Sequence, residues 1–138
     1  MICLDTAAVI AFLNDKPSPV LSRTTAALKG GLEVAVSSIV LFELRYGVGK
    51  SLRQERNARR IAELLSSPIQ VLDFSAGDAE EAGDIRAALE HVGTPIGSYD
   101  ILIAAQARRR DAVLVTANTR EFRRVPRLKI EDWTTTSS

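Results

Sequence analysis

The stretch Met1-Ile2-Cys3-Leu4-Asp5-Thr6-Ala7-Ala8 opens the chain and decides how the rest is interpreted. A short apolar run ends in a carboxylate, and an alanine-rich segment follows at once. This pattern predicts a β-strand that leads directly into a helix. Ligands of open α/β sheets bind at the carboxyl ends of the strands, so Asp5 is a candidate site residue. The alternative is that Asp5 is only the N-cap of the helix beginning near Thr6.

Length and composition indicate one soluble globular domain. The chain has 138 residues, of which 46% are hydrophobic and 25% are charged. No apolar run reaches the roughly 18 residues of a membrane span, and the N-terminus does not resemble a secretion signal. We therefore expect a cytoplasmic protein with no membrane segment, a domain over residues 1–133 and a flexible tail over 134–138.

The cysteine and histidine content argues against an intramolecular disulfide and a zinc site. Cys3 and His91 are the single residues of their types. One cysteine forms no intramolecular disulfide, and one histidine with one cysteine does not make a zinc site.

The net charge of +1 hides an uneven distribution. Acids crowd residues 73–90, while arginines crowd residues 53–60 and 108–127. Such arginine clusters either follow the phosphates of a nucleic acid or form the solvated faces of helices.

Strands and helices are predicted to alternate along the chain. Expected strands cover about residues 1–4, 32–36, 69–74, 112–115 and 128–130; expected helices cover 7–13, 20–29, 39–46, 51–65, 75–92 and 100–107. We expect Gly47 and Gly49 to loosen the end of the third helix, and Ser98 to cap the last one. The alternation predicts the α/β class, with a mainly parallel sheet flanked by helices on both sides.

Further polar residues are expected near Asp5. Glu43 lies on an apolar helix face, where a carboxylate is costly to bury unless a cation or metal meets it; the alternative is a surface position or an arginine partner. Asp100 is in the first turn of a helix that is apolar nearly all round, where it also suits the helix dipole. Asn118 follows the last buried strand, although asparagine also favours turns.

Three acids in one dry pocket need a cation, because they do not all stay ionised without one. Carboxylate oxygens suit Mg²⁺ or Mn²⁺. Such ions orient a water, lower its pKa and offset charge on a phosphorus under attack. The constellation therefore predicts metal-dependent phosphodiester hydrolysis.

Four blocks in this order resemble a known family. They are Ile-Cys-Leu-Asp-Thr (2–6), Ser-Ser-Ile-Val-Leu-Phe-Glu-Leu-Arg-Tyr-Gly (37–47), Gly-Thr-Pro-Ile-Gly-Ser-Tyr-Asp (93–100) and Val-Thr-Ala-Asn-Thr-Arg-Glu-Phe-Arg-Arg-Val-Pro (115–126). The chain resembles the PIN-domain ribonucleases, and more narrowly the VapC toxins of bacterial type II toxin–antitoxin systems. The resemblance runs from Met1 to about Trp133.

The resemblance implies a single PIN domain with a flavodoxin-like sheet. It implies that Asp5, Glu43 and Asp100 bind Mg²⁺, for which Mn²⁺ substitutes, and that they act in catalysis with Asn118. Supporting candidates are Thr6, Thr116 and Glu121.

The resemblance also implies what the protein acts on and binds. The implied substrate is RNA, with tRNA and the initiator tRNA favoured, so that cleavage stops translation. A VapB-like antitoxin is implied to neutralise the toxin by placing its tail in a groove, and a homodimer is implied within a larger complex. Apolar faces of residues 7–13, 20–28 and 51–65 are the predicted groove, the alternative being ordinary core packing.

Two departures from the family pattern favour an alternative function. The usual Asp-Thr-Asn is Asp5-Thr6-Ala7 here, and a position that is often a fourth aspartate is Asn118, with Glu121 nearby. The alternative is a catalytically impaired PIN-fold module that binds RNA or antitoxin. A phospho-accepting receiver domain fits poorly, because Asp5 has no adjacent acid and no lysine follows a late strand.

Overall fold

The computed structural model describes residues 1–14 and 16–135. The strands are β1 (Ile2–Leu4), β2 (Val34–Ser37), β3 (Gln70–Leu72), β4 (Val113–Val115) and β5 (Lys129–Glu131). The helices are α1 (Thr6–Leu13), α2 (Pro19–Lys29), α3 (Ser38–Lys50), α4 (Gln54–Ser66), α5 (Ala76–His91), α6 (Ser98–Arg109) and α7 (Thr119–Phe122).

The strands form one sheet in the order β3-β2-β1-β4-β5, and every neighbouring pair is parallel. The predicted α/β class with a parallel sheet is therefore confirmed. From β1 the chain moves outward to β2 and β3, then returns to the other side of β1 to add β4 and β5. The direction of winding thus reverses between β1 and β4, and in such sheets the crevice at this point is the ligand site.

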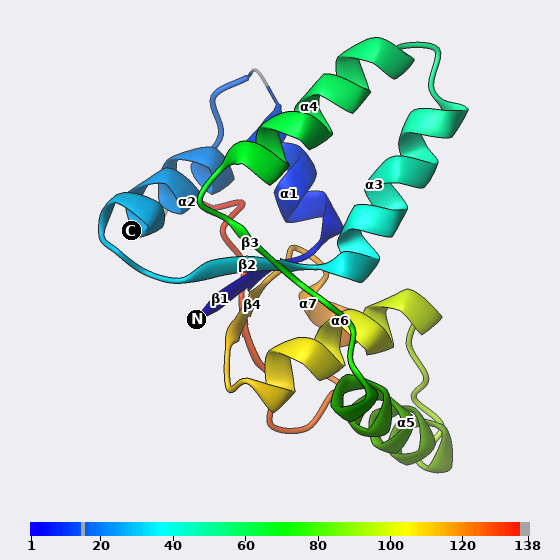
Figure 1. Cartoon of the computed structure of the whole chain (residues 1–138). Coiled ribbons are helices and arrows are strands. Elements are labelled where there is room, and N and C mark those ends of the chain that lie inside the picture. Colours follow the sequence, from blue (N-terminus) through cyan, green and yellow to red (C-terminus); the bar gives the residue numbers. More distant parts are fainter. Residues whose placement is uncertain (15, 136–138) are drawn as a thin grey trace.

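Helices cover both faces of the sheet, as predicted. In Figure 1, α1, α2 and α4 lie on one side of the strands and α5 and α6 on the other, while α3 and α4 form a hairpin. Strand β2 is buried throughout, as Val34, Ala35 and Val36 show, and β1 and β4 are buried except at their first residues. Helix α6 is buried along most of its length, as its apolar sequence predicted.

Three local predictions differ from the structure. Helix α3 continues through Gly47 and Gly49 to Lys50, because neither glycine departs from helical geometry. Gly97, not Ser98, is the N-cap of α6, and Ser98 is its first residue. The short helix α7 was not predicted at all.

The predicted domain end at residue 133 stays a prediction. Trp133 is buried, and its indole N–H donates to Glu131 Oε1 at 3.0 Å. Residues 136–138 of the predicted tail lie outside the described residues. Within residues 1–14 and 16–135, no helix has the length and apolar character that a membrane crossing needs.

A buried ion-pair cluster joins α5 to α6. Asp78 is fully buried, and its Oδ1 accepts from Arg109 at 3.1 Å and from Arg110 at 3.0 Å. Burial alone raises the pKa of Asp78, but these arginines, Ser75 and Gln106 donate hydrogen bonds that hold it well below its usual range. Arg108 pairs with Glu81 at 2.7 Å. The arginines at the end of α6 are therefore engaged within the fold, and only the later part of the 108–127 cluster remains available to phosphates.

Candidate active site

Asp5 lies at the switch point of the sheet and is 7% exposed. Its Oδ1 accepts the N–H of Ala8 at 2.8 Å, so Asp5 is the N-cap of α1, and its own N–H donates to Val115 O of β4. Burial raises the pKa of Asp5, and the Glu43 charge adds to this, while hydrogen bonds from Thr116 and Ala8 act in the opposite direction. The capping and site interpretations of Asp5 are therefore compatible.

Glu43 reaches the same crevice from α3. Its Oε1 accepts the hydroxyl of Thr6 at 2.8 Å, which ties the start of α1 to α3. The Glu43 side chain is half-buried, and its charge raises the pKa of both Asp5 and Asp100. The fold therefore brings carboxylates from three separate elements close enough to influence one another in one site.

Asp100 sits in the first turn of α6 and shows the strongest charge crowding. Burial, together with the neighbouring carboxylates of Glu121, Glu43 and Asp5, raises the pKa of Asp100 to about 6. Gly97 allows this arrangement, because a Cβ at that position would lie 3.2 Å from Asp100 Oδ2. The sequence interpretation missed Gly97, although a glycine three residues before a site acid was a usable signal.

Glu121 and Asn118 form a hydrogen-bonded pair beside Asp100. Glu121 interacts directly with the Asp100 side chain. Asn118 is exposed at the rim, and its Nδ2 donates to Glu121 Oε2 at 3.0 Å, while its backbone N–H donates to Thr116 Oγ1 at 2.9 Å. Asn118 therefore orients Glu121. The sequence could not reveal this, because the contact depends on α7, which sets Asn118 and Glu121 three residues apart on one helical turn.

The donor set fits a hard divalent cation. The four carboxylates, the amide of Asn118 and the hydroxyls of Thr6 and Thr116 offer oxygen ligands, which Mg²⁺ prefers. The raised pKa of Asp100 also reveals negative charge that its neighbours do not offset. Among the described residues, no three such side chains converge tightly enough to surround one ion. Mg²⁺ tolerates this, because it commonly keeps several waters and takes one or two protein carboxylates.

A groove of about 220 Å³ opens beside Glu43. It lies between α1, α3 and α4, and its walls are Thr6, Ile10, Leu13, Glu43, Leu44, Gly47, Val48, Asn57, Arg60 and Ile61. The sequence predicted a groove made by residues 7–13, 20–28 and 51–65. Residues of the first and third segments line this groove, whereas α2 packs on the core through Val20, Thr24 and Ala27; an antitoxin contact of residues 20–28 stays a prediction.

Comparison with known proteins identifies the class of this fold and site. The PIN domain family matches residues 2–128, so the chain is a PIN-domain protein. The tRNA(fMet)-specific endonucleases VapC of Salmonella typhimurium and Shigella flexneri are 42% and 44% identical over 130 residues, which cover 94% of this chain and 96% of each relative. VapBC2 of Rickettsia felis, solved with a promoter DNA fragment, superposes with a TM-score of 0.88 at 39% identity, covering 96% of this chain and 99% of that chain. The chain therefore belongs to the VapC family of PIN-domain endoribonucleases.

Proposed function

We propose that this VapC-family endoribonuclease is the toxin of a type II toxin–antitoxin pair. In this proposal it cleaves tRNA in the cytoplasm and so inhibits translation, with initiator tRNA as the first substrate to test. The names of the Salmonella and Shigella relatives support that choice of substrate. The observation that carries the proposal is the mutual influence of Asp5, Glu43, Asp100 and Glu121 at the switch point of the sheet.

In the proposed mechanism, Asp5, Glu43 and Asp100 would hold Mg²⁺, or Mn²⁺ as a substitute, one or two of them directly and the rest through its waters. A bound Mg²⁺ supplies a more acidic water and positive charge near the scissile phosphate. Ala8 N–H fixes Asp5, Thr6 fixes Glu43 and Asn118 fixes Glu121, so the carboxylates meet the substrate already oriented. Because the pKa of Asp100 is raised to about 6, this carboxyl is largely ionised, and so able to bind the metal, only near neutral pH and above.

The test is cleavage of a total bacterial tRNA pool by the antitoxin-free protein, with Mg²⁺ or with EDTA. Asp5→Asn is the sharpest variant, because asparagine caps a helix as well as aspartate does but lacks the charge. Asp100→Asn is its companion, and Asp84→Asn on the exposed face of α5 is the matched control. A discrete fragment made only with metal, and only by wild type and Asp84→Asn, is the expected result. Cleavage by Asp5→Asn at the wild-type rate refutes the proposal.

A second function rests on Ala7. This residue is exposed in the first turn of α1, directly after the acid and threonine of the site, where the resemblance to the family implies an asparagine. An impaired site would leave a module that binds RNA or antitoxin without turnover. Calorimetric titration with Mg²⁺ discriminates the two functions, because an impaired site takes up no metal that depends on Asp5 and Asp100. Gain of cleavage in Ala7→Asn would then identify the missing amide as the cause.

We further propose that a VapB-like antitoxin occupies the groove beside Glu43. The VapBC complexes among the structural neighbours support a partner of this kind. Ile10 and Leu13 from α1, Leu44 and Val48 from α3, and Ile61 from α4 give the groove an apolar wall. Because the groove reaches Thr6 and Glu43, a segment bound there would also obstruct the acidic site.

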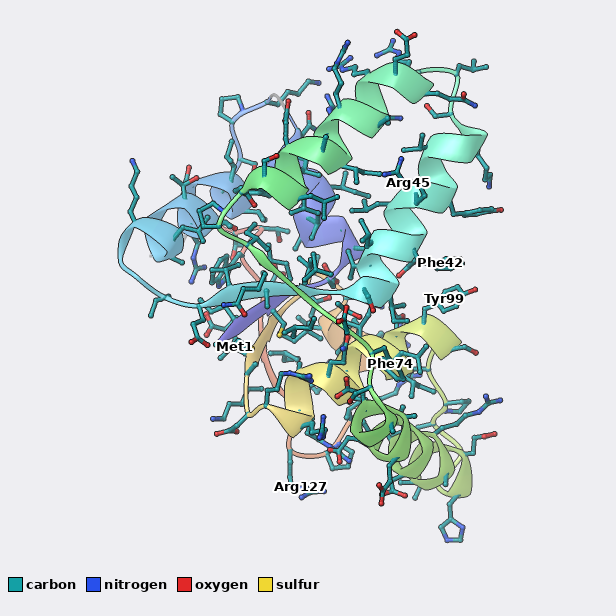
Figure 2. All side chains as sticks on the ribbon, viewed as in Figure 1. Met1, Phe42, Arg45, Phe74, Tyr99 and Arg127 are labelled. Atoms are coloured by element: carbon teal, nitrogen blue, oxygen red, sulfur yellow. The ribbon has the colours of Figure 1, made fainter. Side chains whose placement is uncertain are left out.

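We also propose that the protein forms a homodimer within a larger toxin–antitoxin complex. Phe42, Tyr46, Leu65 and Tyr99 are all about half exposed or more, and such a patch favours protein association. The Phe42 and Tyr99 rings lie 5.4 Å apart, edge to face, and Figure 2 displays them on the same side of the molecule as Arg45.

Charge complementarity supports the binding of a second copy of the chain to the exposed patch around Phe42 and Tyr99. Phe74 N–H donates to Ser38 Oγ at 3.2 Å, which keeps the exposed Asp73 beside the start of α3. In a symmetric dimer, two copies of α3 can cross antiparallel at Phe42. Arg45 of each copy then faces Ser38 and Asp73 of the other copy. We expect Tyr46→Asp to convert the dimer into a folded monomer in sedimentation velocity; an unchanged sedimentation coefficient would exclude this surface.

A further inference from the structure

Three arginines follow the acidic site along α7 and the turn after it. Arg120, Arg123 and Arg124 are all exposed. In the part of the chain that the structure describes, none of their guanidinium groups pairs with an acid, whereas Arg108, Arg109 and Arg110 do. The three arginines thus carry positive charge that the fold itself does not use.

The three arginines leave α7 and the following turn in different directions relative to Glu121. Helical residues follow one another by about 100°. Glu121 interacts with Asp100, and Phe122 is buried in the core. Arg120 therefore points into solvent at about 100° from Glu121, while Arg123 points about 160° away from it.

Arg124 is held at the rim by a contact of its own. Its Nη1 donates to Pro95 O at 2.9 Å. Pro95 lies in the connection that leads to Gly97 and Asp100, so this bond fixes a guanidinium beside the entrance to α6. A guanidinium has five N–H donors, so the bond to Pro95 leaves others for a ligand.

An RNA strand needs cations beside this site. Each phosphate carries a negative charge, and the four carboxylates of the crevice repel it. Arginine binds phosphate through paired N–H donors, and a preformed guanidinium loses little freedom on binding. Cations at the rim would compensate the flanking phosphates, which a metal on the scissile phosphate does not reach.

We propose that Arg120 and Arg124 bind consecutive phosphates of the RNA strand next to the scissile bond, and that Arg123 does not. They are positioning residues, and the inference rests on the proposed ribonuclease function. The RNA backbone then runs from the acidic crevice across α7 toward the Pro95 connection. Such contacts position the strand without reading its sequence.

Binding and cleavage are tested separately as a function of salt. Binding uses an Asp5→Asn background, a fluorescein-labelled single-stranded RNA of about ten nucleotides and fluorescence anisotropy. Arg120→Ala and Arg124→Ala should each lower the slope of log affinity against log salt by about 0.7, while Arg123→Ala leaves it unchanged. In cleavage, the first two variants should raise KM severalfold with kcat unchanged. Arg124→Lys should restore the salt slope, because it keeps the charge.

Several outcomes would overturn the proposal. Unchanged slopes in Arg120→Ala and Arg124→Ala would do so, as would an equal loss in Arg123→Ala, because that result means a general charge effect. A loss of affinity for the antitoxin with an unchanged RNA slope would assign the arginines to the protein partner. If the wild type cuts no RNA but binding still depends on Arg120 and Arg124, the ribonuclease proposal fails and the phosphate contacts stand.

Discussion

The crowding of carboxylates predicts that Mg²⁺ binding depends on pH. Burial and three neighbouring acids raise the pKa of Asp100 from 3.8 to about 6. Mg²⁺ competes with the proton for this group, so each pH unit below that pKa weakens the apparent affinity about tenfold. We therefore expect the dissociation constant to be about tenfold higher at about pH 5 than at about pH 7, where Asp100 is largely ionised.

The assay is isothermal titration with MgCl₂ at both pH values, repeated in buffers of different ionisation enthalpy to count released protons. Asp100→Asn should bind more weakly and lose this pH dependence, while the control Asp84→Asn should behave as wild type. Equal affinity at the two pH values, or a pH dependence that persists in Asp100→Asn, would refute the reasoning.

The raised pKa of Asp100 also makes the stability of the metal-free protein depend on pH. A carboxyl whose folded-state pKa is raised favours folding in its protonated form, and that contribution is lost as pH rises through the folded-state pKa. For Asp100 the loss therefore begins near the ordinary value of 3.8 and is complete above about pH 6. Added Mg²⁺ should raise the thermal midpoint more above this pH than below it, because the ion binds the ionised form.

Three further predictions concern separate parts of the molecule. Asp5→Ala and Asp5→Asn should both abolish cleavage. In urea unfolding, only Asp5→Ala should lower the free energy of unfolding, by about 1 kcal/mol, because it removes the cap of α1. Equal stability of the two variants would contradict the capping role. Asp78→Ala should lower the free energy of unfolding by about 3 kcal/mol. In the wild type, the stabilisation that Asp78 provides should disappear as pH falls below the ordinary aspartate range, and urea unfolding at a series of pH values measures this loss. Ile10→Asp, at a groove position that is 51% exposed, should weaken antitoxin binding in calorimetry while the control Leu52→Asp does not; equal affinities would remove the antitoxin from the groove.

Much of the fold followed from local sequence, because its signals are local. Apolar runs that end in a polar residue marked the strands, and α5 begins close to the expected residue 75, where Ser75 and Asp78 form a capping box. The glycines of α3 misled the prediction of its end, because helix formation there depends on the whole hairpin with α4 and not on one propensity.

The acids of the candidate site were also recognisable in the sequence. Asp5 and Asp100 stand where an apolar strand ends and an apolar helix begins, and both features are visible without a structure. Asn118 was found in the same way, but its contact with Glu121 was not, since four residues of helix had to form first.

The sequence by itself determined the alternation of strands and helices, the family and the candidate acids of the site, because these depend on residue type and spacing. Only the tertiary structure decided which charges remain free. Arg109 and Arg110 pair with the buried Asp78, whereas Arg124 donates to the backbone oxygen of Pro95 and pairs with no acid among the described residues. The physical reason is that pairing and burial arise between segments far apart in the chain, and both the pKa of Asp100 and the role of each arginine depend on those neighbours.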